Sequence, residues 1–187
     1  FSFGEPLSLD IRPNAKLDGN ALLTLCIDWS ANVHNVLYTI AGNQGSGGIP
    51  IPTDNFNGVN ISFSRQQDGV YRYLDVSNLG SVFTGVDSRL VGLETSLDGR
   101  RLVHLLAPGR NVTLLNQDGS THRNTGTSFA APHVAATVAL LQEYGDRQLR
   151  NNQANWSLDA RRHEVMKAIL VNAADKIKDA GDGLTLG

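Results

Sequence analysis

The serine at position 128 is the residue of this sequence best placed to act as a nucleophile. It lies in the segment Gly126 to Ala136, Gly-Thr-Ser-Phe-Ala-Ala-Pro-His-Val-Ala-Ala, and an apolar helical pattern follows it. In the first turn of a helix, backbone N–H groups are unpaired and the helix dipole is positive, so the N–H of Ser128 can stabilise a developing oxyanion. Residue type alone favours a plainer role, the helix N-cap.

A second candidate is Asn43, which follows a short apolar run and a glycine in the sequence Ala-Gly-Asn. Its side-chain amide can donate a hydrogen bond to a tetrahedral intermediate. A Gly-Asn pair on its own is more typical of a turn, because asparagine tolerates left-handed backbone. The role of both residues therefore depends on the wider pattern.

The wider pattern resembles one enzyme family. The string Gly-Thr-Ser-x-Ala-Ala-Pro-His-Val-Ala, ten positions in register, resembles the nucleophile motif of the subtilisin-like serine proteases, the subtilases of peptidase family S8. Ala-Gly-Asn at 41–43 resembles their oxyanion-hole motif, and Leu-Ala-Pro-Gly at 106–109 resembles the turn before the nucleophile. Ser-Phe-Gly at 2–4 is similar to the start of their substrate-binding strand. The resemblance covers nearly the whole chain, least well at 65–100 and 146–157.

The resemblance implies roles for particular residues. Ser128 would be the nucleophile and Asn43 the oxyanion-hole donor, so the two side chains should face one cleft, within about 10 Å of each other. A polypeptide substrate would contact Ser2, Phe3, Gly4, Ile40, Ala41 and Gly42. Gln44 stands where an acidic residue would favour basic substrate side chains, which predicts a weak preference for large neutral P1 residues.

Two of the expected catalytic parts are missing. In subtilases the triad runs Asp, His, Ser along the chain, and the first two precede the Ser-x-Gly strand with which this sequence begins. The five histidines lie in other contexts; His133, for example, is five residues from Ser128, about 140° around the helix axis. His122 is a conceivable surrogate base in a polar loop. Asp28 is interpreted as a solvated helix residue, and His34 as a charge at the end of that helix.

The missing parts predict that residues 1–187 are the C-terminal part of a single subtilase catalytic domain, and that the N-terminal part with the triad Asp and His is a separate or absent segment. The complete parent would be a serine endopeptidase acting through an acyl-enzyme. This chain alone would be almost inactive, because a serine without a base is a poor nucleophile. The alternative is a catalytically inactive module that binds peptides by strand addition along residues 2–4.

Periodicity predicts an α/β fold with three layers and a mostly parallel sheet whose strands are buried on both faces. Apolar residues at spacings of three and four, including Leu22, Cys26 and Trp29, indicate a first helix. A second helix opens at Ser128 and closes near Gly145. The predicted helices are 19–32, 128–145 and 158–174, and the predicted strands are 36–41, 59–64 and 102–106. Residues 65–99 are predicted to be irregular β structure, residues 116–125 to be rich in turns, and residues 146–157 to be a polar insert.

Composition excludes several kinds of partner. A formal charge of −2 with 16 scattered lysines and arginines argues against nucleic acid and anionic membranes. The longest apolar stretches, 33–41 and 134–141, are too short to span a bilayer and are interpreted as core. The single cysteine, Cys26, excludes an internal disulfide and is expected to pack as a small apolar residue. By resemblance, calcium is possible and a secreted or periplasmic location is implied, although no run resembles a dedicated calcium loop.

Overall fold

The computed structural model describes residues 17–42, 51–67, 69–74, 96–175, 177–178 and 185–186. Its elements, in chain order, are α1 (Leu22–His34), β1 (Thr39–Ala41), β2 (Val59–Gln67), β3 (Val70–Leu74), β4 (Leu105–Pro108), β5 (Val112–Leu115), β6 (Thr121–Asn124), α2 (Thr127–Arg150), the 3-10 helix η4 (Leu158–Arg161), α3 (His163–Ala173), β7 (Ile177–Lys178) and β8 (Thr185–Leu186).

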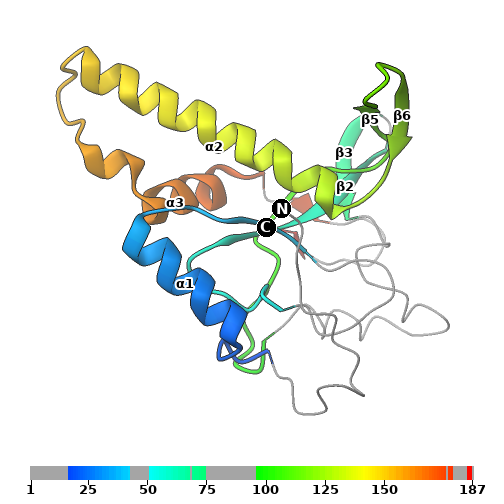
Figure 1. Ribbon diagram of the computed structural model, residues 1–187, viewed down its shortest axis with the longest axis horizontal. Helices are drawn as coiled ribbons and strands as arrows, with labels where there is room; N and C mark the ends of the chain where they lie inside the picture. Colours follow the sequence, from blue (N-terminus) through cyan, green and yellow to red (C-terminus); the bar gives the residue numbers. More distant parts are fainter. Residues whose placement is uncertain are drawn as a thin grey trace.

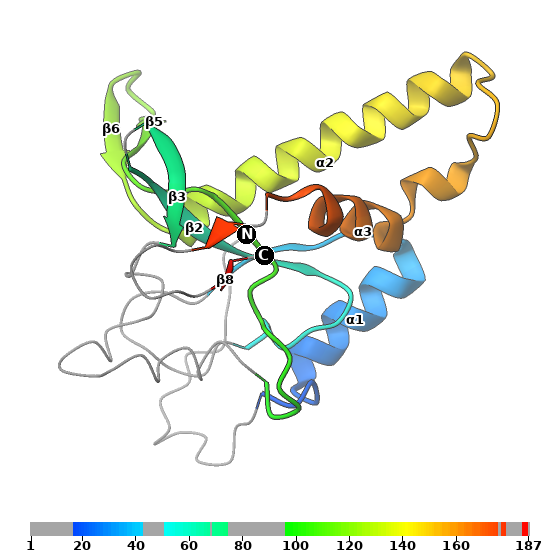
Figure 2. The same cartoon turned by 180° about the vertical axis from the view of Figure 1, so that it is seen from behind.

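The predicted parallel sheet is confirmed, with β2 at its centre. Strand β1 pairs in parallel with the first half of β2, Thr39 opposite Val59, and β4 pairs in parallel on the other side, Ile61 opposite Leu105. The far end of β2 continues into an antiparallel hairpin with β3. Helix α2 lies on one side of these strands and α1 on the other in both views, which gives the expected three layers (Figures 1 and 2).

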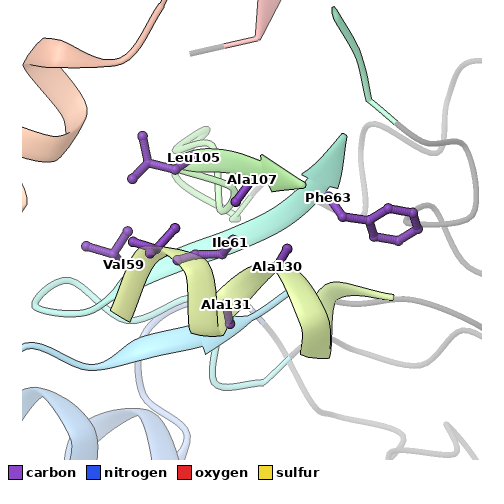
Figure 3. Packing of buried hydrophobic residues seen from close by; sticks show 8 residues of the cluster. Val59, Ile61, Phe63, Leu105, Ala107, Ala130 and Ala131 are labelled. Atoms are coloured by element: carbon purple, nitrogen blue, oxygen red, sulfur yellow. The ribbon is translucent and has the colours of Figure 1, made fainter. Parts of the chain in front are cut away.

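The main core lies between α2 and the sheet (Figure 3). Alternate side chains of β2 point toward the helix, which follows from the two-residue period of a strand. Small residues at the start of α2 let the helix approach the sheet closely. The buried cluster consists of Val59, Ile61, Phe63, Leu105, Ala107, Ala130, Ala131 and Val134.

Several predicted boundaries differ from the observed ones. The first helix begins at Leu22 and runs to His34, where Asn35 adopts left-handed backbone (φ 53°) and ends it. The strand predicted at 36–41 is only Thr39–Ala41, because the N–H of Val36 still bonds back to Ala31 at 3.2 Å. The strand predicted at 102–106 is displaced to Leu105–Pro108, because the carbonyl of Leu102 instead accepts from the side chain of Asn60.

The later elements also differ from the prediction. The polar stretch 116–125 contains strand β6, which pairs with β5 in an antiparallel hairpin. Helix α2 continues past Gly145 to Arg150, so the predicted insert begins as helix. The helix predicted at 158–174 is broken at Arg162, whose backbone is extended (ψ 144°), into η4 and α3.

The apolar stripe that predicted α1 does not face the core. Leu22 is 74% exposed, Trp29 61% and Val33 54%, and Cys26 is also exposed, so its predicted packing as a core residue is wrong. Thr24, Ile27 and Ala31 form the buried face instead. Val36 and Leu140 are exposed as well, so the two long apolar stretches are only partly core. No helix in the described ranges is long and apolar enough to cross a membrane.

Candidate active site

Ser128 is exposed and is the second residue of α2. The helix begins at Thr127, Gly126 occupies the N-cap position, and no side chain caps the helix there. Ser128 is therefore not an N-cap serine. Its position in the first turn leaves its N–H without a helical carbonyl partner and near the positive end of the dipole, the environment that favours negative charge.

The start of α2 is fastened to the carboxyl end of β4. The N–H of Gly126 donates to the carbonyl oxygen of Gly109 at 2.9 Å, directly after the strand. A Cβ atom at Gly109 would lie 2.3 Å from Cβ of Phe63 and 2.8 Å from the carbonyl oxygen of Gly126. Only glycine fits this approach, so the glycine of the Ala-Pro-Gly turn sets how closely the serine helix meets the sheet.

A second contact fastens α2 to the carboxyl end of β1. The buried hydroxyl of Thr127 donates to the carbonyl oxygen of Gly42 at 2.9 Å. Gly42 itself donates its N–H to the carbonyl oxygen of Ile61 at 2.7 Å. Thr127 precedes Ser128 and Gly42 precedes Asn43, so this bond joins the neighbours of the two predicted catalytic residues. Thr127 was not predicted as part of the site, because its hydroxyl bonds to a residue 85 positions away.

The other predicted site residues are only partly within the described ranges. Ile40 and Ala41 are half-buried in β1, and Gly42 is buried directly after it. Asn43, Ser2, Phe3, Gly4 and Gln44 lie outside the described residues. The predicted separation of Ser128 and Asn43 therefore stays a prediction.

The histidines of the chain are engaged elsewhere, and among the described residues none hydrogen-bonds to Ser128. His133, on the same helix, has its Nδ1 2.7 Å from the carbonyl oxygen of Phe129. His163 is buried against Asn35, with its ring Nδ1 3.2 Å from the Asn35 side-chain oxygen. His34 is exposed and meets Trp29 edge to face, and His122 is exposed in β6.

His104 is the histidine with the most altered environment. Its Nδ1 accepts a hydrogen bond from the N–H of Asn60 at 3.1 Å. Burial, helped by the nearby charges of Lys167 and Arg100, lowers the pKa of His104 from 6.5 to about 4. It is therefore neutral at pH 7, and its acceptor is occupied by a backbone amide, which is a structural role.

Asp28 is not the simple solvated residue that was predicted. Its carboxylate accepts from the backbone N–H of Asn57 at 2.7 Å and from that of Phe56 at 3.0 Å. It thus fixes the loop before β2 to α1.

Among the described residues there is no group of three histidine, cysteine, aspartate or glutamate side chains that could hold a metal ion, so these residues offer calcium no such cluster.

The fold and this site together describe an α/β protein in which a serine-bearing helix begins at the carboxyl ends of parallel strands. The family model of the subtilase family matches residues 24–187, and the chain belongs to that family. Subtilisin from Bacillus sp. (strain TA39) is 28% identical over 124 residues, which cover 64% of this chain and 28% of that relative.

Solved structures agree with this assignment. Patellamide maturation protease PatA is 26% identical with a TM-score of 0.54, and the match covers 87% of this chain and 50% of that one. The S41 psychrophilic protease is 26% identical with a TM-score of 0.53, over 87% of this chain and 49% of that one. Sphericase, at 21% identity and a TM-score of 0.52 over 92% and 53%, shares the fold. The chain spans about half the length of these three structures.

Proposed function

We propose that this chain carries the nucleophile and oxyanion-hole half of a serine endopeptidase, with Ser128 as the attacking residue. The observation that carries the proposal is the exposed Ser128 in the first turn of α2, on a helix that Thr127 ties to Gly42, one residue before Asn43. A serine serving only to begin a helix has no need of that tie. Membership of the subtilase family supports the same chemistry.

The proposed reaction has two halves. Ser128 Oγ attacks the carbonyl carbon of the peptide bond while a histidine base takes the hydroxyl proton, and the carbonyl electron pair moves to oxygen. The N–H of Ser128 and the side-chain amide of Asn43 donate hydrogen bonds to that oxyanion. Collapse expels the amine, which takes the proton from the histidine and leaves an acyl-enzyme. Water then attacks by the same route and releases the acid, and no step involves a metal.

The base and the triad aspartate come, in this proposal, from a segment of the same domain outside residues 1–187. The support is that no histidine among the described residues hydrogen-bonds to Ser128, and that most are held by other groups. Loss of the base from a Ser-His-Asp site lowers kcat roughly 10⁶-fold. The chain alone is therefore expected to be almost inactive.

The proposed substrate of the complete enzyme is a polypeptide. Residues Thr39 to Gly42 would form one wall of the P1 pocket, and Gln44 would weakly favour large neutral P1 residues.

The test compares residues 1–187 alone with the same chain joined to its natural upstream segment. We expect only the joined protein to hydrolyse peptides and to form a covalent adduct with a serine-directed phosphonate, mapped by mass spectrometry to Ser128. Ser128→Ala should abolish both. Ser120→Ala, which removes an exposed serine of the β5–β6 turn, should change neither.

Two results would contradict different halves of the proposal. Peptidase activity of the isolated chain that disappears in His122→Ala would identify an internal base. A joined protein that neither hydrolyses peptides nor reacts with the phosphonate, and whose upstream segment lacks a suitable histidine and aspartate, would instead favour the peptide-binding module.

A further inference from the structure

We propose that Arg123 is a specificity residue of the peptidase site, which selects polypeptides with an aspartate or glutamate shortly after the cleaved bond. This inference rests on the proposed function of Ser128 and narrows its substrate class. It concerns the side of the site formed by the β5–β6 hairpin, opposite the side that β1 forms.

The start of α2, which bears Ser128, is attached on two sides. Thr127 ties it to Gly42 after β1, and Gly126 ties it to Gly109 after β4. Strands β1 and β4 pair with opposite edges of β2, and β4 runs on into the β5–β6 hairpin, which stands beside the start of α2 in both views (Figures 1 and 2). A peptide is extended across its scissile bond, so a substrate with its P1 side chain along β1 directs the following residues toward the hairpin.

The two sides differ in charge. Residues 39–42 on the β1 side are all uncharged, whereas residues 110–125 of the hairpin side contain two arginines, one aspartate and no lysine or glutamate. The aspartate, Asp118, lies in the distant turn, where its carboxylate accepts from the N–H and the hydroxyl of Ser120 at 2.9 and 2.6 Å. Arg123 is only five residues before Ser128 in the sequence. An acidic substrate side chain on the hairpin side therefore meets a positive potential.

The guanidinium of Arg123 is available to a substrate. The side chain is exposed, and within the part of the chain that the structure describes no carboxylate, hydrogen-bond acceptor or ring contacts it. Arg123 lies opposite Thr113 in the hairpin, so both side chains share the exposed face of β5. Other arginines already have a carboxylate within 3.3 Å, namely Arg100, Arg147, Arg161 and Arg162. A guanidinium without such a partner can bind a substrate carboxylate through two N–H groups.

The distance along the chain limits which substrate positions Arg123 can contact. Five residues of extended chain span at most about 17 Å, and the turn at Gly126 shortens that span. The long arginine side chain covers part of it, and an extended substrate advances roughly 3.3 Å per residue. We therefore place the acidic residue at the second to fourth positions after the cleaved bond, P2′ to P4′. An arginine that serves only as a solvated surface residue gives no preference at these positions.

The experiment measures kcat/KM of the joined protein for matched peptides that carry Asp, Asn or Lys at P2′, P3′ or P4′. We expect Asp to be preferred over Lys about fivefold at one of these positions, the scale of an exposed ion pair. Arg123→Glu should reverse the preference and Arg123→Gln should abolish it. Arg150→Glu is the matched control, because it makes the same charge change at an exposed arginine at the other end of α2, and it should keep the preference. The preference should also fall in 1 M NaCl, where the Debye length is about 3 Å.

The phosphonate adduct at Ser128 reports that the site is formed in each variant, and Arg123→Gln decides the matter if Arg123→Glu does not fold. Equal kcat/KM for the Asp and Lys peptides at all three positions would overturn the inference and leave the proposed function standing. So would a preference that survives in Arg123→Gln, or one that Arg150→Glu removes equally. A joined protein that cleaves no peptide and forms no phosphonate adduct would instead overturn the proposed function itself.

Discussion

Strand β2 presents apolar side chains to α2 on one face and polar side chains to the loop that holds α1 on the other. Val59, Ile61 and Phe63 pack against the helix in a core without hydrogen-bonding side chains. From the opposite face, the amide nitrogen of Asn60 donates to the carbonyl oxygens of Thr53 and Leu102, at 2.5 and 2.7 Å. Both faces are buried, so the strand joins two interfaces of opposite chemistry.

The two helices are consequently attached in different ways. Helix α2 buries Ala130, Ala131 and Val134 against the strand. Helix α1 buries Ile27 and Ala31, but it is also held by buried hydrogen bonds: the hydroxyl of Thr24 donates to the carboxylate of Asp54 at 2.5 Å. The apolar stripe that predicted α1 stays exposed. An apolar contact tolerates changes of partner that keep volume, whereas a buried hydrogen bond fails when either partner is removed. The two attachments should therefore respond differently to substitution.

The largest effect is expected at Asp54. Its carboxylate accepts from the hydroxyl of Thr24 and from the N–H of Gly19 at 2.8 Å, and Asp54→Ala leaves both donors buried without an acceptor. We expect the free energy of unfolding to fall by about 3 kcal/mol in urea denaturation. Asp18→Ala, at an exposed carboxylate beside the same helix, should shift the midpoint far less. Equal effects of the two would mean that α1 is not held by these bonds.

A matched pair of valines tests the apolar attachment. Val134 of α2 is 6% exposed in the core, and Val33 of α1 is 54% exposed in the stripe. Val134→Ala should lower the free energy of unfolding by about 2 kcal/mol, and Val33→Ala by less than about 0.5 kcal/mol. The measurement is again urea denaturation of the two variants. A large loss in the free energy of unfolding for Val33→Ala would show that the apolar stripe of α1 is covered in solution.

The sequence predicted which helices and strands form better than it predicted which side chains of those elements are buried and what they contact. The parallel sheet, the serine helix and its start followed from the motif around Ser128 and from apolar periodicity. The buried face of α1 did not, because helix periodicity identifies an apolar stripe without naming what packs on it. The partner of Thr24 is a carboxylate 30 residues away, and no local pattern encodes such a pairing.

For the candidate site, Ser128 was predicted from a local string of ten residues, and its catalytic role stays a prediction. The sequence did not identify Thr127, because the hydrogen bond to Gly42 joins residues 85 positions apart. The break at Arg162 was missed for the same reason: Asn35, from the end of α1, accepts the N–H of His163 at 2.9 Å and so fixes where α3 begins. Contacts between distant segments decide these features.

The smallest effect is a pH dependence confined to the polar face of β2. His104 accepts from the N–H of Asn60 there, beside Lys167 and Arg100, and burial lowers its pKa to about 4 from 6.5. The unfolded chain therefore binds a proton that the folded chain excludes between these values. The contribution of neutral His104 to the free energy of unfolding is therefore complete above pH 6.5 and falls as the pH drops toward 4.

Between pH 7.5 and pH 5 we expect a loss of about 1 kcal/mol in the free energy of unfolding, after allowance for the partial exposure of the ring. The side chains of Asp98, Asp118 and Glu164 have pKa values lowered by hydrogen bonds, so they stay ionised in this range and do not add to the slope. His104→Asn offers Asn60 an acceptor that does not titrate and should flatten the profile, whereas His122→Asn, at an exposed histidine, should retain it. A slope unchanged in His104→Asn would place the acid sensitivity outside the polar face.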